Sequence, residues 1–360
     1  MGATGWLIRR FMRRRWVALS ALALIVALGG TGAFVAAGAA DRSASAYGRY
    51  LARADVSDVV INPSLFTSEI DRLIRDLPGV RSVTTDALLV ASIDDGAPRT
   101  RAEFDAEPDA LQVRGSADGR YSAMDRPVLD EGRLPTGPSE VLVSADLAAA
   151  RGIAVGDVVP LSFWSGGDEL LAEPDDVVSP VGVERVTVVG IATLADEVLP
   201  DDLYPRERLI VSPDMAARYD CLPDLPPYDA TFEAAVAQAA PAGCATSYRY
   251  YALELEGGPG AVAATLDAFL RESAPLNPEV PPEMAAHGAG YYLVATTTAD
   301  ERDRVERSMQ PTVTALGVLA AAAAAVTVAV SALAVARELQ RSEDDQRTWW
   351  RLGLSARQRW

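Results

Sequence analysis

The 360-residue sequence contains no lysine, one histidine and two cysteines. A nucleotide-hydrolysing P-loop needs a lysine on the β- and γ-phosphates, so the chain cannot hydrolyse ATP by that route. A histidine-based triad or multi-histidine metal site needs more than His287, whose Ala-Ala-His-Gly-Ala-Gly surroundings favour a solvated surface side chain. The sequence therefore predicts no catalytic residue, no cofactor and no metal site, and we expect a protein that is not an enzyme.

Charge is absent from two long stretches, 16–40 and 308–336. About 20 apolar residues cross a hydrocarbon core roughly 30 Å thick, so both stretches are predicted transmembrane helices in the lipid bilayer. A cleaved signal peptide is the alternative for the first, because Ala37-Gly38-Ala39 fits a small-x-small cleavage pattern. The usual apolar region of such a peptide is about 7 to 15 residues, and the longer run here favours a retained anchor.

Arginine is distributed unevenly around these stretches. Five arginines lie between residues 9 and 15, and six follow residue 336. Because basic flanks stay in the cytoplasm, both termini are expected inside and the middle outside a multi-pass cell-membrane protein. Segment 41–300 carries 43 acidic residues and 19 arginines, a net charge of −24 that argues against nucleic acid as a partner. Its acidic pairs, such as Asp94-Asp95, lack EF-hand spacing and are interpreted as solvated loop charges.

Both cysteines, Cys221 and Cys244, fall in the segment expected outside, in stretches that contain proline or glycine. An oxidising compartment favours their pairing, and we hypothesise a disulfide between them.

The predicted layout has five parts. They are a basic amphipathic cytoplasmic helix (1–15), a first span (16–40), an extracytoplasmic domain with helical stalks (41–307), a second span (308–336) and a cytoplasmic segment (337–360).

Within the central part, hydrophobic periodicity and turn residues predict a mixed α/β domain, with two subdomains. Helices are expected at 42–54, 66–77, 145–151, 213–219, 260–273 and 298–308. Strands are expected at 80–93, read as a pair, and at 110–114, 140–144, 157–163, 185–192, 209–212 and 251–255.

Small residues recur at four-residue spacing in both predicted spans, as Gly32/Ala36 and as Gly317/Ala321/Ala325. Such faces let helices approach closely, so we expect them to pack against other helices. The alternative is that alanine here reflects composition only.

Three stretches carry a resemblance to a known family. Residues 125–135 read Asp-Arg-Pro-Val-Leu-Asp-Glu-Gly-Arg-Leu-Pro and are followed by Glu-Val-Leu-Val-Ser at 140–144 and Arg-Gly-Ile-Ala-Val-Gly-Asp at 151–157. After the second span comes Trp-Arg-Leu-Gly-Leu-Ser-Ala-Arg-Gln at 350–358. In this order between two spans, they resemble the FtsX/MacB-like permeases of ABC transporters, of the actinobacterial type with a MacB-like periplasmic domain.

The resemblance implies the permease subunit of an ABC transporter or mechanotransmission complex, driven by a separate cytoplasmic ATPase subunit. Segment 337–360 would then dock on that ATPase. Arg351 would face it as a charge, Leu352 would anchor the contact, and Gly353 would end the helix. The alternative for this segment is a frayed cytoplasmic tail.

Permeases of this kind usually carry four spans for each such domain, whereas two are predicted here. We therefore expect part of a longer permease, with further permease helices or a second permease copy as partners. The alternative function is a two-span, membrane-anchored extracytoplasmic binding or sensor protein.

Overall fold

The computed structural model describes residues 3–63, 67–105, 111–116, 119, 123–166, 173–194, 207–221, 243–274 and 293–351. The chain divides into two compact units. One comprises Tyr47–Val305, and the other combines Met1–Ala46 with Glu306–Trp360.

Two long continuous helices begin and end the described chain. Helix α1 comprises Ala3–Ala54 and helix α10 comprises Thr298–Arg351. Each contains a portion long and apolar enough to cross a membrane, within Ser20–Ala54 and Thr298–Arg337. The predicted helical stalks at 42–54 and 298–308 are confirmed as helix, since no turn separates them from the apolar stretches.

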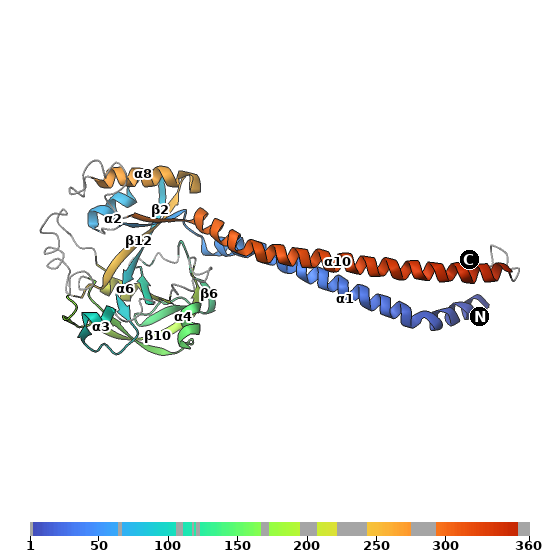
Figure 1. Ribbon diagram of the computed structural model, residues 1–360. Coiled ribbons are helices and arrows are strands. Elements are labelled where there is room, and N and C mark those ends of the chain that lie inside the picture. Colours follow the sequence, from blue (N-terminus) through green and yellow to red (C-terminus); the bar gives the residue numbers. More distant parts are fainter. Residues whose placement is uncertain are drawn as a thin grey trace. The chain divides into compact units, whose positions relative to one another are not determined.

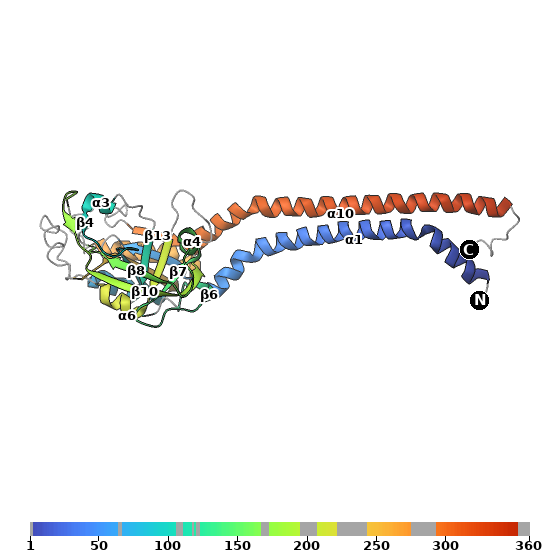
Figure 2. The same ribbon diagram turned by 90° about the horizontal axis from the view of Figure 1, so that it is seen from below.

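Helices α1 and α10 lie side by side in their unit (Figures 1 and 2). A stripe of partly or fully covered residues runs along each helix at alternating spacings of three and four residues. On α1 the stripe is Gly29, Ala33, Ala36 and Ala40, and on α10 it is Val313, Leu316, Ala320, Ala323, Thr327 and Val330. This alternation keeps a seam facing its partner in paired helices.

The closest approach lies at Gly29, where an added methyl group would overlap the side chain of Thr327. Gly32 and Gly317, by contrast, face open space within the described residues. Within this pair of helices the contact line therefore passes through Gly29 and Ala36 and not through Gly32 or Gly317. The expectation that the four-residue faces pack against other helices stays a prediction. A strict four-residue row drifts around a helix by about 40° at each step, so it leaves the contact line.

Unit Tyr47–Val305 is a mixed α/β domain built on one large sheet. Its described strands are ordered β13-β1-β12-β2-β5-β11-β7-β10-β8-β3, with β6 paired to β10. The strands on this path and branch are β1 Val59–Pro63, β2 Val80–Leu89, β3 Ala91–Ser92, β5 Leu111–Gly115, β6 Val128–Gly132, β7 Glu140–Ser144, β8 Val158–Phe163, β10 Gly182–Thr193, β11 Glu207–Val211, β12 Thr246–Leu255 and β13 Leu293–Thr297. A second small sheet pairs β4 (Arg99–Thr100) with β9 (Val177–Val178).

The helices of the domain are short, and α2, α4 and α6 begin at side-chain caps. They are α2 Ser68–Arg75, α3 Arg101–Asp105, α4 Ala145–Arg151, α6 Pro213–Tyr219 and α8 Val262–Ser273, the last preceded by the 3₁₀ turn η3 Gly258–Ala261. The Thr67 hydroxyl accepts a hydrogen bond from the Ile70 N–H, and Gly152 ends α4 in the left-handed conformation that glycine adopts most easily. Both ends agree with the sequence prediction.

One predicted element is wrong. Residues 80–93 do not pair with each other, because β2 is a single ten-residue strand that pairs with β12 and β5. The following β3 pairs instead with β8. The stretch contains no glycine or proline at which the chain could turn back, so the β-branched run continues straight.

Two separate hydrophobic cores cover the sheet. Helices α4 and α6 pack over one, which includes residues of β5, β7, β8, β10 and β11. Helices α2 and α8 pack over the other, which includes residues of β1 and β12 (Figure 1). In both, alternate strand residues face the helices, as the two-residue period of a strand requires.

The seam between α1 and α10 can be tested at Gly29. Gly29→Ile should separate the helices, because its side chain would overlap Thr327, whereas Gly32→Ile enters open space. The readout is disulfide trapping between cysteines placed at Ala36 and Ala320, one heptad along each helix from the close approach, followed by peptide mapping. We expect a several-fold loss of trapping with Gly29→Ile only; equal trapping in both variants would contradict the seam.

Candidate functional site

The first and last helices join the sheet at neighbouring strands. Strand β1 follows the end of α1 after residues 55–58, and α10 begins immediately after β13. The two strands are antiparallel partners, with Val59 opposite Thr297. Because chain direction reverses between antiparallel partners, the end of α1 and the start of α10 meet at the same end of this pair. We call this region the junction: the last turns of α1, residues 55–58, residues 124–126 and the first turns of α10.

The carboxyl end of α1 is closed by a segment distant in sequence. The last carbonyls of a helix lack partners within the helix. Here the Arg126 N–H donates to the Ala54 carbonyl at 2.7 Å, and the Asp125 N–H donates to the Asp55 carbonyl at 3.0 Å. Ala54 is fully buried, so the bond from Arg126 satisfies a carbonyl in a residue shielded from water. Asp55 is exposed.

The backbone is strained at both sides of this contact. Asp55 and Asp125 have φ angles of 53° and 49°, and within the described ranges they are the only non-glycine residues with positive φ. Such conformations cost on the order of 1–3 kcal/mol and persist where surrounding contacts hold them. Both strained residues therefore sit where the terminal helix enters the domain.

Ser57 connects three parts of the junction through its backbone. Its N–H donates to the Asp125 carboxylate (Oδ1) at 2.9 Å. Its carbonyl accepts a hydrogen bond from the Thr298 hydroxyl, at the first residue of α10. The adjacent Asp58 accepts a hydrogen bond from the Leu255 N–H at 2.8 Å, which extends the connection to β12.

Aromatic side chains hold the last turns of α1 against the domain. Tyr47 is buried, and its ring is nearly parallel to that of Tyr50, with centroids 6.2 Å apart. The Tyr50 hydroxyl donates to the Thr193 carbonyl at 3.3 Å, at the end of β10. The three-residue spacing of these tyrosines places them on one face of the helix, and their contacts fix that face against the domain.

The electrostatics of the junction centre on Asp125. Burial raises the pKa of this carboxyl above its ordinary value, and the hydrogen bonds from Ser57 oppose that shift. The Arg126–Asp55 ion pair, at 3.0 Å, is largely exposed and contributes little because water screens it. The junction therefore depends on backbone hydrogen bonds and on one half-buried carboxylate.

Of the three predicted coupling residues, the structure describes only Arg351. Arg351 is the last residue of α10, and its side chain is exposed. Leu352 and Gly353 lie outside the described residues, as does His287. No group of three or more potential metal ligands occurs in the part of the chain that the structure describes.

Asp94, in the acidic pair at 94–95, is held by neighbouring protein groups. It accepts hydrogen bonds from Ser92 and from the Gly96 N–H, and it pairs with Arg99 at 2.9 Å. These contacts stabilise the ionised carboxylate and lower its pKa, against the effect of its partial burial. Asp94 thus closes a turn.

Sequence reasoning missed the junction residues Ser57, Asp125 and Thr298. Asp125 belongs to the family-like stretch 125–135, but its role depends on contacts 68 residues away in sequence. The available signal was weak: three polar residues, Asp55, Ser57 and Asp58, lie between a helix and a strand.

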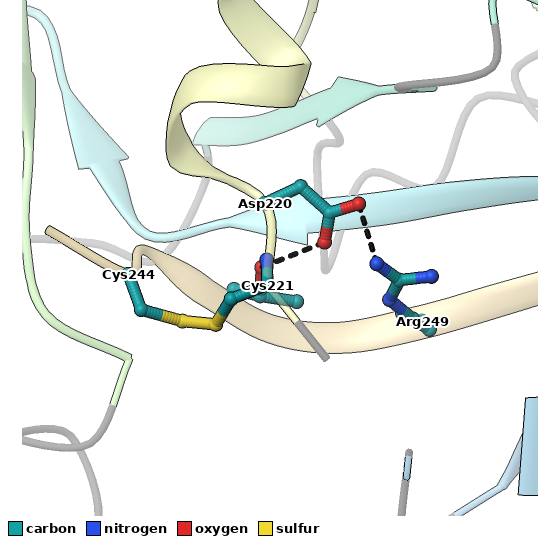
Figure 3. The surroundings of a disulfide bond; sticks show 5 residues. Asp220, Cys221, Cys244 and Arg249 are labelled. Atoms are coloured by element: carbon teal, nitrogen blue, oxygen red, sulfur yellow. Dashed lines mark hydrogen bonds and ion pairs between the residues drawn. A yellow bond between two sulfur atoms is a disulfide. The ribbon is translucent and has the colours of Figure 1, made fainter. Parts of the chain in front are cut away.

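Cys221 and Cys244 form a disulfide, with Cα atoms 5.8 Å apart (Figure 3). Cys221 lies just after α6, and Cys244 lies just before β12. Beside the bond, Asp220 forms an ion pair with Arg249 at 2.5 Å and accepts a hydrogen bond from the Thr246 hydroxyl at 2.9 Å. The disulfide and this ion pair together attach the end of α6 to β12.

Removal of the disulfide should lower stability. A disulfide between residues 23 positions apart restricts the conformations of the unfolded chain, which stabilises the folded state by about 3 kcal/mol. The Cys221→Ser/Cys244→Ser variant should therefore unfold at a lower temperature than the oxidised wild type, as measured by intrinsic fluorescence. Wild type treated with a dithiol reductant should match the variant; an unchanged melting temperature in both would show that the bond does not stabilise the domain.

Two substitutions at Asp125 distinguish the effect of its charge on stability from the effect of its hydrogen bond. Asp125→Ala removes the acceptor for the Ser57 N–H and should cost about 1–3 kcal/mol of unfolding free energy. Asp125→Asn keeps an acceptor, tolerates positive φ and carries no charge.

The pH dependence follows from the raised pKa. The folded state binds the Asp125 proton more readily than the unfolded chain, so this residue's contribution to stability falls as pH rises through the folded pKa. The melting temperature of wild type should therefore fall relative to that of Asp125→Asn as pH rises from about 4 toward neutrality. Parallel melting curves of the two proteins across this window would contradict the electrostatic assignment.

Comparison of the sequence with models of known protein families finds no match, and a search of curated proteins finds no similar one. No family is therefore assigned to the chain, and its function must follow from the terminal helices and the junction.

Proposed function

We propose that the chain is a permease subunit of an ABC transporter or of a mechanotransmission complex. In this proposal the two apolar helices cross the cell membrane, a separate ATPase acts on them from the cytoplasm, and the α/β domain outside responds. The observation that carries the proposal is the junction, where both helices continue into hydrogen-bonded neighbouring strands of one sheet.

The geometry of the junction favours transmission of movement from the helices to the domain over simple anchoring. A membrane anchor needs only a flexible linker to its domain. Here no flexible linker intervenes: α10 follows β13 without a gap, and the four residues between α1 and β1 are held by backbone hydrogen bonds. A displacement of one helix along the other would therefore load the β1–β13 ladder instead of being absorbed in a loop.

The surfaces of the helices support a membrane setting. Outside the seam, large apolar side chains are exposed on both helices, among them Leu28, Phe34 and Val35 on α1 and Val318, Val328 and Leu333 on α10. Exposure of so continuous an apolar surface to water is unfavourable, whereas lipid or further permease helices would cover it. The hydroxyls of Thr327 and Ser331 donate to carbonyls one turn earlier, which satisfies them inside an apolar environment.

The family-like stretch contributes to the domain architecture. Arg133 donates two hydrogen bonds to the Glu140 carboxylate, which also accepts from the N–H groups of Thr136 and Gly137. These bonds lower the pKa of Glu140 and close the connection between β6 and β7. The motif that suggests a MacB-like domain is thus a set of turn-forming residues, consistent with a resemblance in fold.

Co-purification tests the proposal. The tagged full chain is extracted from membranes of its source in mild detergent, and partners are identified by mass spectrometry. We expect an ATPase with a Walker motif to accompany the wild type and the Glu272→Ala control, whose altered side chain is exposed on α8. Deletion of residues 349–358 should abolish that association.

The outcomes are distinct. Recovery of a kinase or regulator with no ATPase would contradict the permease function and favour a membrane-anchored sensor. Equal ATPase recovery with the deletion would leave the function standing but would contradict the docking role given to Arg351, Leu352 and Gly353.

A further inference from the structure

Strand β13 is an end strand of the large sheet. It pairs with β1 on one side, and on its other side no strand lies beside it in the part of the chain that the structure describes. The Thr298 N–H donates to the Asp58 carbonyl at 3.3 Å, one residue beyond the pair Val59–Thr297. Because alternate residues of an antiparallel strand direct their backbone groups to opposite sides, the N–H and C=O groups of Ala295 and Thr297 point away from β1. The open edge of β13 therefore presents a row of backbone donors and acceptors.

The sequence of β13 does not protect this edge. Proteins usually protect open edges with charged residues, with proline or by keeping the strand very short. At the other ends of the described sheet, β3 is two residues long, the adjoining β8 contains Pro160, and β6 exposes Asp130 and Glu131. Strand β13 has the sequence Leu-Val-Ala-Thr-Thr, without charge or proline, and Thr296 is exposed. Its edge is thus the one best suited to accept a further strand.

We infer that the open edge of β13 is a docking site, at which a different extracytoplasmic protein adds an extended segment antiparallel to β13. Main-chain hydrogen bonds to Ala295 and Thr297 would hold the segment, as in other cases of strand addition. Residues of the segment that pair with Ala295 share its face, so they would extend the core under α2 and α8 and should be apolar. Residues on the exposed Thr296 face should be polar.

Charge complementarity favours a segment with basic residues at its amino end. The first turn of α10, immediately after β13, carries Asp300 and Glu301. Since an antiparallel segment begins beside the end of β13, its first residues would lie near these carboxylates. Segment 41–300 as a whole carries 43 acidic residues and 19 arginines, which favours the approach of a basic segment.

A second copy of the chain does not suit this edge. Two copies related by a two-fold axis would pair their β13 strands antiparallel. Because α10 follows β13 without a gap, the two α10 helices would then leave the shared ladder at opposite ends. In the proposed function, on which this step rests, both helices must enter the same membrane. The added segment would lie directly beside the β1–β13 ladder, so the protein that supplies it would receive any displacement that the terminal helices transmit.

Amide hydrogen exchange on the full chain in detergent tests whether the edge is open. It is read at single residues by mass spectrometry with electron-transfer fragmentation. The Ala295 N–H, which points away from β1, should exchange many-fold faster than the Thr296 N–H, which faces β1. Slow exchange at both amides would show that the edge is already covered, by another part of the chain or by a second copy, and would overturn the inference.

Peptide binding tests the added ladder itself, with fluorescence anisotropy as the readout. The probe is a short fluorescent peptide in which valine and threonine alternate behind amino-terminal arginines. With its valines on the Ala295 face, the valine N–H groups point at β13 and the threonine N–H groups point away. N-methylation of the valines should therefore weaken binding several-fold, whereas N-methylation of the threonines should not. Absence of binding by the unmodified peptide, or an equal effect of both methylations, would contradict the docking site.

A substitution in β13 locates the bound peptide. Ala295→Pro removes the N–H that points outward, and proline is tolerated in an edge strand at such a position. Its melting temperature should stay near that of wild type, while peptide binding falls several-fold; Ala295→Val keeps the N–H and should bind as wild type does. Unchanged binding to Ala295→Pro would place the peptide elsewhere and overturn the inference. If Ala295→Pro does not fold, the two methylated peptides decide the question on wild type. No ATPase enters these measurements, so their failure is separate from a failure of the permease function.

Discussion

The pairing of β1 with β13 is the constraint on which the rest of the domain depends. It joins residues from the two ends of the sequence, Val59 and Thr297, in one hydrogen-bonded ladder. Because α1 precedes one strand and α10 follows the other, both apolar helices must leave the sheet at the same place. The ladder therefore joins the two ends of the chain segment that contains both hydrophobic cores.

At the junction, this arrangement requires strained backbone conformations and additional hydrogen bonds. Ala54 is fully buried, and the Arg126 N–H satisfies its carbonyl, while the Asp125 N–H donates to the carbonyl of Asp55. Asp55 and Asp125 adopt left-handed backbone conformations to permit this contact. Such strain is retained only where the surrounding bonds outweigh it, and here those bonds converge on Ser57 and Asp58. A joint of this kind transmits displacement better than a loop would.

Local signals predicted much of the secondary structure. Cap residues Thr67 and Gly152 delimit α2 and α4, and both apolar stretches continue as helix into the predicted stalks. Where prediction failed, distant partners decided the outcome. The stretch 80–93 is one long strand because β12 offers it a matching ladder, and the α1–α10 seam follows the partner helix rather than a four-residue repeat.

The sequence by itself determined which segments are apolar enough to cross a membrane and where most of the helices and the central strands lie, because these depend on composition, periodicity and caps that act within a few residues. It did not predict β1 and β13, whose pairing joins residues from opposite ends of the domain. Only the tertiary structure decided the candidate site. Ser57, Asp125 and Thr298 meet although they are 68 and 241 positions apart along the chain, and nothing local distinguishes them. The same holds for Asp220 and Arg249, which pair across 29 positions of the chain.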